Sequence, residues 1–230
     1  MDLSPLLQAA REGNLNLVRE LHKAGADLNE TSKNGSSALI YASENGHIDV
    51  IQYLIENGAD PAITTKMGGT ALNRAAENGS IEIMKYLLDH GTPIGNLALI
   101  VAAREGNLEA VELLFQHGAD VNAQQRWGQS ALMLAAREGH TAVAKFLLDS
   151  GANVRLRDKN GDTALNIALD NDNPDIVMQL RRAGAKAQTR KVVTPVQTDD
   201  DDDDDAGDVD DIISDDADVA PDDVDLDEEI

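Results

Sequence analysis

The five histidines are the side chains whose chemistry would first suggest acid–base catalysis or metal binding. His47 and His140 each follow a glycine, His90 and His117 each precede one, and His22 stands alone in a segment that we expect to be an exposed helix face. Metal ligands converge on one point, whereas histidines at equivalent places in separate segments are structural elements of each segment. We therefore predict helix and loop roles for these histidines and no metal site.

Other patterns that carry catalytic chemistry do not occur in the sequence. There is no Gly-x-Ser-x-Gly elbow, no phosphate loop ending in Gly-Lys-Ser, no His-Glu-x-x-His and no cysteine. The segment from Asp202 onward is loosely similar to a calcium-binding loop, but Ala206 and Ile213 stand where an oxygen ligand and the bidentate Glu should be. The sequence thus predicts no catalytic residue, no metal and no cofactor, and a protein that is not an enzyme.

The charge is concentrated at one end of the chain. The sequence has 230 residues and a net charge of −23. Residues 1–198 hold all 19 basic side chains and 23 acidic ones, so residues 199–230 alone carry −19. A segment of that kind has too few apolar side chains to offset chain entropy, and its charges repel one another. We predict a nearly neutral folded body, a linker over 188–198 and a disordered acidic tail over 199–230.

Targeting signals are not evident in the sequence. The start, MDLSPLLQAAREGN, has no basic stretch followed by an apolar core, and the longest uncharged run, residues 91–103, is shorter than the ~20 apolar residues of a membrane span. A chain without cysteine suits a reducing compartment. We expect a protein of the cytoplasm, or of the nucleus if the source is eukaryotic, without membrane contact.

Two series of glycines recur in phase along the chain. The first begins Gly-Ala or Gly-Thr pairs at intervals of 33, 33, 27, 33 and 33, at Gly25, Gly58, Gly91, Gly118, Gly151 and Gly184. The second keeps the same intervals, at Gly13, Gly46, Gly79, Gly106 and Gly139. Blocks such as SALM and TALN come before the second series, and their Ser or Thr can cap a helix. The pattern predicts units of two helices, each ending at a glycine in the left-handed conformation.

The stretch SALMLAAREGHTAVAKFLLDSGANV carries, in order, a Thr-Pro-Leu-His-like block, Ala-Ala, Gly-His and a Leu-Leu-x-x-Gly-Ala ending. At a period of 33 residues this pattern resembles ankyrin repeats. The resemblance covers about residues 3–187 and implies an all-α repeat solenoid of stacked helix-turn-helix units with short β-hairpin fingers. We predict an ankyrin-repeat domain over 1–187, with units of about 1–31, 32–64, 65–94, 95–124, 125–157 and 158–187.

Two departures from the pattern are informative. Six residues are missing between Gly91 and Gly106, so the segment before the fourth unit is too short for a finger and we expect a notch in the finger row. In the last unit Asp172 takes the place of the first-helix glycine, and Pro174 follows it. Both suit a terminal capping unit, because Asp tolerates the left-handed region and Pro starts helices well.

The resemblance places the binding surface on the finger tips and the ends of the first helices. The partner-binding residues that it implies are Lys33, Asn34, Glu44, Asn45, Lys66, Met67, Glu77, Asn78, Arg104, Glu105, Arg126, Trp127, Arg137 and Glu138. Trp127, the single tryptophan, falls on a tip beside Arg126, which is the composition of an interface hot spot; it could instead pack flat on the neighbouring finger. The basic tip residues occupy the same position in each repeat. Basic residues at that position are also common where the edge only meets solvent.

The acidic tail has two interpretations. It could serve only solubility. Aliphatic residues such as Ile212, Ile213 and Leu226, however, stand between the Asp and Glu residues of the tail. They favour a recognition segment for a basic, partly apolar partner surface. Eight cations between Arg155 and Lys191 adjoin the tail in sequence, and a tethered acidic strand would compete with nucleic acid for them. We expect no direct nucleic-acid binding.

These observations predict a non-catalytic protein–protein interaction module, or scaffold, that is a monomer when alone. The ankyrin-like surface would bind a protein partner with a basic surface, and the tail would engage or shield that surface, as in an escort, chaperone or inhibitor of a nucleic-acid-binding protein. Two alternatives stay open. The tail could fold back on the chain's own cations and autoinhibit binding, or the chain could be a regulatory or targeting subunit of an enzyme complex.

Overall fold

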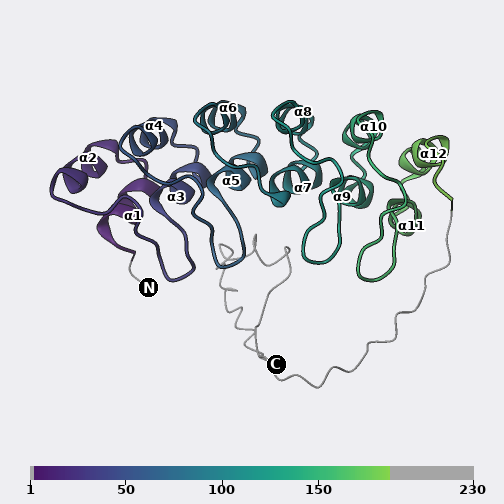
Figure 1. The fold of residues 1–230 in the computed structure, drawn as a ribbon, viewed down its shortest axis with the longest axis horizontal. Coiled ribbons are helices and arrows are strands. Elements are labelled where there is room, and N and C mark those ends of the chain that lie inside the picture. Colours follow the sequence, from purple (N-terminus) through teal and green to yellow (C-terminus); the bar gives the residue numbers. More distant parts are fainter. Residues whose placement is uncertain (1–2, 187–230) are drawn as a thin grey trace, which may run out of the picture. The chain divides into compact units, whose positions relative to one another are not determined.

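The computed structural model describes residues 3–186. The predicted linker and acidic tail, with Ile212, Ile213 and Leu226, lie outside the described residues. Within residues 3–186 the chain forms twelve α-helices and no strand (Figure 1). Their bounds are α1 Pro5–Arg11, α2 Leu15–Lys23, α3 Ala38–Glu44, α4 Ile48–Glu56, α5 Ala71–Glu77, α6 Ile81–Asp89, α7 Asn96–Arg104, α8 Leu108–Gln116, α9 Ala131–Glu138, α10 Thr141–Asp149, α11 Ala164–Asp170 and α12 Pro174–Arg182.

Each first helix packs on its own second helix and on the first helices of the neighbouring pairs. The odd-numbered helices form one row and the even-numbered helices form another (Figure 1). Such an array is stabilised by contacts between adjacent units rather than by one central core. The prediction of an all-helical repeat solenoid is confirmed, while the exact unit boundaries stay a prediction.

Hydroxyl side chains begin five of the six first helices. In α5, for example, the Thr70 Oγ1 accepts a hydrogen bond from the Asn73 amide at 3.1 Å. Ser4, Ser37, Ser130 and Thr163 cap their helices in the same way. These bonds satisfy amides at the helix start that have no partner within the helix. The helix α7 differs, because Gly95 precedes it and no side chain caps it.

The glycine after a first helix lets the next unit reach that helix's carboxyl end. Gly106 has φ of 72°, and a Cβ there would lie 2.5 Å from the His140 ring. The His140 Nε2 instead donates to the Arg104 carbonyl at 2.7 Å. His47 makes the same contact with the Arg11 carbonyl at 3.0 Å. These two histidines therefore satisfy helix carbonyls across a unit boundary, as their recurrence at the Gly-His position predicts.

The last unit uses other residue types at the same two positions. Asp172 has φ of 53° in place of the glycine. The Asn173 Nδ2 donates to the Ala136 carbonyl at 2.9 Å, as the histidines do elsewhere. Pro174 is the first residue of α12. The predicted local roles of Asp172 and Pro174 are confirmed, while their role in a terminal cap stays a prediction.

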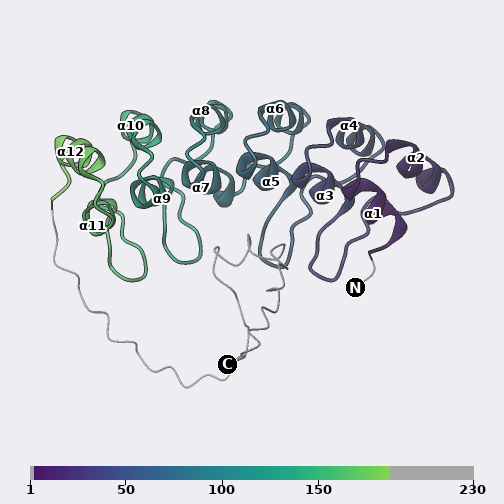
Figure 2. The same ribbon diagram turned by 180° about the vertical axis from the view of Figure 1, so that it is seen from behind.

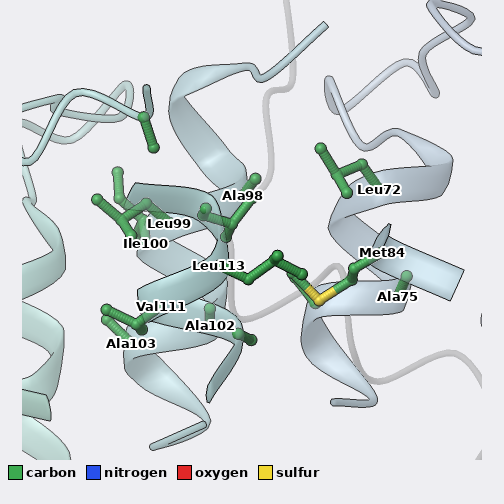
Figure 3. Packing of buried hydrophobic residues seen from close by; sticks show 14 of the residues in the cluster. Leu72, Ala75, Met84, Ala98, Leu99, Ile100, Ala102, Ala103, Val111 and Leu113 are labelled. Carbon is green, nitrogen blue, oxygen red and sulfur yellow. The ribbon is translucent and has the colours of Figure 1, made fainter. Parts of the chain in front are cut away.

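The core combines alanines of the first helices with larger aliphatic side chains from both rows, such as Leu72 of α5 and Leu87 of α6. Ala75, Ala102 and Ala103 have no exposed surface. Met84 of α6 points toward Leu113 of α8, so that the second-helix row is also joined by apolar contact (Figure 3). Truncating such a buried leucine or methionine costs about 2–5 kcal/mol. Small side chains in the first row allow close helix packing.

Four loops reach away from the second helices, beyond the row of first helices (Figure 2). We name them finger one (residues 31–37), finger two (64–70), finger three (124–130) and finger four (157–163). Two of them carry an isolated antiparallel bridge, Thr31 with Ser37 and Gln124 with Ser130. The predicted β-hairpin fingers are therefore tight turns rather than strand pairs in the described part of the chain.

The finger before α7 is missing. Only residues 90–95 join α6 to α7, and they form no loop in that row (Figure 1). The predicted notch is confirmed, and we call it the finger gap: the space between fingers two and three, over α7. Because neighbouring helices stack about 8–10 Å apart, the two fingers that border the gap are separated by two such spacings.

One histidine was wrongly predicted. His22 is half-buried rather than simply exposed, and its Nδ1 lies 2.9 Å from the Tyr53 hydroxyl. Their rings meet edge to face, with centroids 5.8 Å apart. The reason is that α2 stacks beside α4, which closes that face of α2 to solvent.

Replacing Gly106 by alanine should destabilise the protein more than replacing Gly118. Both residues have positive φ, 72° and 90°, so either change costs about 1–3 kcal/mol of backbone strain. Only at Gly106 does the new Cβ also displace a contacting ring, which adds about 1 kcal/mol for the lost His140 hydrogen bond. Urea unfolding of the full chain measures the difference. Equal losses, or no relief when His140→Ala is added to Gly106→Ala, would contradict the cross-unit contact.

Candidate partner-binding surface

Each finger tip is a β-turn closed by a glycine. In finger one the Gly35 amide donates to the Ser32 carbonyl at 2.9 Å, and Gly35 has φ of 87°. A Cβ at Gly35 would lie 3.1 Å from the backbone of finger two, so this position must stay small. The turn leaves the two residues before the glycine exposed. The predicted tip residues are all exposed: Lys33, Asn34, Lys66, Met67, Arg126 and Trp127.

The fingers associate in two pairs. The Lys66 amide of finger two donates to the Asn34 carbonyl of finger one at 2.9 Å, and the Lys159 amide of finger four donates to the Trp127 carbonyl at 2.9 Å. Nearer the helices, the Asp60 amide donates to the Asn29 Oδ1 at 2.7 Å. The Asn153 amide does the same with the Asn122 Oδ1 at 2.7 Å. Finger positions are therefore fixed pairwise, with the finger gap between the pairs.

Trp127 is both exposed, as expected for an interface hot spot, and in contact with the neighbouring finger. Its side chain is 38% exposed. The Lys159 Nζ lies 5.2 Å from the centre of its ring, a cation–π contact from the neighbouring finger. The lysine therefore holds the indole in place while a large apolar surface still meets solvent. An aromatic side chain fixed in that way loses little further entropy on binding.

The predicted residues at the first-helix ends fall into two groups. Asn45, Asn78, Glu105 and Glu138 are exposed, whereas Glu44, Glu77, Arg104 and Arg137 are half-buried. Asn78 also has a structural contact, because its Nδ2 donates to the Glu44 carbonyl of the preceding unit at 2.6 Å. The half-buried group therefore offers less surface to a partner than the sequence pattern predicts.

An ion-pair network at the carboxyl ends of α5 and α7 joins units three and four. Glu77 of α5 receives Arg74 at 2.9 Å and Arg104 of α7 at 3.4 Å, and Arg104 also pairs with Glu105 at 2.9 Å. The side chains of Arg74, Glu77 and Arg104 are only 11–18% exposed. On the second-helix row, Lys85 and Glu109 form an exposed pair at 3.8 Å between the same two units. Ion pairs thus connect the units that no finger contact joins.

Two hollows near the ends of the array were not predicted from the sequence. One, of about 430 Å³, lies between α1 and finger one, and its lining includes Leu3, Lys33 and Tyr41. The other, of about 770 Å³, lies over α11 and α12, where Leu169 and Met178 are exposed beside Arg181. The second lies on the side of the last described unit on which a further repeat would stack.

Burial raises the pKa of the Tyr86 phenol above its ordinary value, and the Glu56 carboxylate adds to the effect. The phenol is therefore neutral at physiological pH. Within residues 3–186 there is no group of three or more His, Cys, Asp or Glu side chains that could hold a metal ion. None of the helices in that range has the length and apolar character to cross a bilayer.

Replacing Glu77 by glutamine should destabilise the chain, because the charge that receives Arg74 and Arg104 is lost in a mostly buried site. We expect a loss of about 1–3 kcal/mol in the free energy of unfolding, measured by urea denaturation. The matched control is Lys85→Gln, whose exposed pair should contribute less than about 0.5 kcal/mol. Similar small losses for both variants would show that the network does not hold units three and four together.

Comparison with known proteins agrees with the geometry. A family model of three ankyrin repeats matches residues 6–98, 62–125 and 99–191. No curated protein sequence matches the chain. Several solved structures, in contrast, are similar to the chain. The ankyrin repeat domain of human ASB11 has 28% sequence identity and a TM-score of 0.71, with 82% of this chain and 87% of that chain covered.

Two bacterial structures are similar as well. An ankyrin repeat domain from Acinetobacter baumannii has 31% identity and a TM-score of 0.69, covering 80% of this chain and 100% of its own. A chain in the complex of the Bd0816 predatory endopeptidase from Bdellovibrio bacteriovorus with the immunity protein Bd3460 has 28% identity and a TM-score of 0.69, covering 79% of this chain and 99% of its own. The family model, the solved structures and the six stacked helix pairs lead to one conclusion: the chain belongs to the ankyrin-repeat family.

Proposed function

We propose that this ankyrin-repeat protein is a non-catalytic interaction module that binds a protein partner along its finger tips and first-helix ends. The observation that carries the proposal is the row of exposed tips, in which Trp127 is contacted by Lys159 of the next finger. Ankyrin repeats in general bind proteins, and here the tips combine cationic and apolar side chains. The first-helix residues Asn45, Glu105 and Glu138 are exposed and extend the same surface.

The acidic C-terminal segment has a distinct role in this proposal: it engages or shields a basic surface of the same partner. The segment carries −19 in 32 residues, and it is covalently attached to the partner-binding surface. A tethered segment acts at a high effective concentration, so weak charge contacts add to the affinity of the finger tips and first-helix ends for the partner. The partner would then be a basic protein, such as one that binds nucleic acid, with this chain as its escort or inhibitor. Such a partner would be met in the cytoplasm, or in the nucleus of a eukaryote.

A second candidate is regulation or targeting of an enzyme. One structural neighbour comes from a complex of an endopeptidase with an immunity protein, which favours this candidate. In that case the enzyme would bind the finger side, and the acidic segment would serve solubility or autoinhibition. The two candidates differ in whether affinity depends on the acidic segment.

Affinity capture with the full chain and with a chain ending at Thr198 separates the candidates. A basic partner should be recovered by the full chain, lose at least tenfold in affinity without residues 199–230, and dissociate steeply as salt rises, because its charge pairs are exposed. An enzyme recovered equally by both chains would favour the second candidate. Tighter binding by the shortened chain would instead show autoinhibition.

Trp127→Ala should weaken the binding of a partner by about 1–3 kcal/mol, whichever candidate holds, because a fixed aromatic anchor is lost. The matched control is Phe115→Ala: Phe115 on α8 is 37% exposed against 38% for Trp127, but it lies on the second-helix row. Titration of the captured partner into each variant measures the change. Equal losses in both variants would place the partner elsewhere than on the fingers.

A further inference from the structure

The finger gap interrupts a ladder of backbone hydrogen bonds. Within each finger pair, a basic residue's amide donates to the carbonyl of the preceding tip, Lys66 to Asn34 and Lys159 to Trp127. By the repeat, the groups that face the gap are the Met67 carbonyl of finger two and the Arg126 amide of finger three. Neither has a hydrogen-bond partner within residues 3–186. The gap thus has a backbone carbonyl that can accept a hydrogen bond on one side and a backbone amide that can donate one on the other.

The tip side chains change character at the gap. The residue before the turn glycine is asparagine on the two outer fingers, Asn34 and Asn160. On the two fingers that border the gap it is Met67 and Trp127, which are 37% and 38% exposed. Apolar side chains on exposed tips gain from being covered by a partner. Of these two side chains Met67 follows the repeat toward the gap, whereas the Trp127 ring contacts Lys159 of finger four.

Beside Gly68 the described chain places a side chain where finger one meets backbone. In finger one, a Cβ on Gly35 would meet the backbone of the next finger at 3.1 Å. The equivalent Cβ on Gly68 would meet only the Leu97 Cδ1 of α7, at 3.7 Å. Leu97 is half-buried, and it stands where the next finger's backbone would otherwise lie. An incoming turn would therefore meet an apolar side chain rather than a filled array.

The charge at the gap selects the chemistry of the occupant. Lys66 and Arg126 are exposed on the two bordering tips, and neither forms an ion pair within the described part of the chain. A copy of the chain's own fingers would bring a third cation, because all four carry Lys or Arg at this place. A carboxylate at the same place would be attracted by both neighbours instead.

We propose that the finger gap receives a β-turn from a protein partner, which takes the place of the missing finger and presents an Asp or Glu to Lys66 and Arg126. The turn donates a backbone amide to the Met67 carbonyl and accepts from the Arg126 amide, so the ladder of the existing fingers continues through the partner. Met67 and Leu97 supply the apolar contact. This inference rests on the proposed function, because it assigns one element of the partner to one part of that surface.

Two backbone-cyclised peptides test the proposal on the full chain. Both copy residues 155–163 of finger four, RLRDKNGDT; one keeps the lysine that copies Lys159 and the other has glutamate there. The Glu peptide should bind at least fivefold tighter than the Lys peptide, and the ratio should fall below twofold in 0.5 M salt. Saturating Glu peptide should slow hydrogen exchange of the Arg126 amide at least tenfold and leave the paired Lys66 and Lys159 amides unchanged.

Two variants of the full chain make the test specific. In the filled variant, residues 92–97 are replaced by a copy of residues 119–130, which restores the 33-residue interval and occupies the gap. It should lose at least tenfold in affinity for the Glu peptide. Arg126→Glu leaves the gap open and should bring the two peptides to within twofold of each other, or favour the Lys peptide. This second variant keeps the proposal testable if the filled variant does not fold.

The outcomes that overturn the proposal are distinct. Equal binding of the Glu peptide by the native and filled chains, or no change at the Arg126 amide, would show that the gap is not the site. Protection of that amide without peptide, growing with protein concentration, would assign the gap to a second copy of this chain and also overturn it. If these tests fail while Trp127→Ala still weakens partner binding, only the gap assignment falls and the proposed function stands.

Discussion

The structure depends on how one unit reaches the helix end of the unit before it. A first helix ends in carbonyls that have no partner within the helix. The glycine that follows it, with positive φ and no Cβ, leaves room for His47 or His140 of the next unit to donate to them. Because a single two-helix unit cannot bury its apolar faces alone, contacts of this kind between adjacent units stabilise the array.

The finger gap shows what happens when one of the connections between units is absent. Units three and four have no finger contact, and the ion pairs of Glu77 with Arg74 and Arg104 lie there instead, mostly buried on the first-helix row. The helix α7 also begins without a side-chain cap. The fingers therefore form two hydrogen-bonded pairs separated by a gap, and the exposed apolar tips, Met67 and Trp127, are on the fingers that border it.

The sequence predicted the features that depend on residue spacing. Glycine intervals located the two-helix units and the missing finger, and Asp172 with Pro174 located the left-handed residue and the start of the last helix. The contacts of His22 with Tyr53 and of Glu77 with Arg104 could not be predicted, because they depend on which side chains face each other across two units. For the same reason the pattern did not distinguish the half-buried Glu77 and Arg104 from the exposed Asn45 and Glu138.

The account's central claim is that partners bind on the finger side of the array. Site-specific photo-crosslinking tests it most directly, with a benzophenone side chain placed in turn at Met67, Trp127 and Phe115 of the full chain in the cells that make it. These positions are 37%, 38% and 37% exposed, so differences in yield report location rather than accessibility. The account predicts one shared protein adduct from Met67 and Trp127 and none from Phe115. An adduct of equal yield from Phe115, or from Phe115 alone, would contradict it.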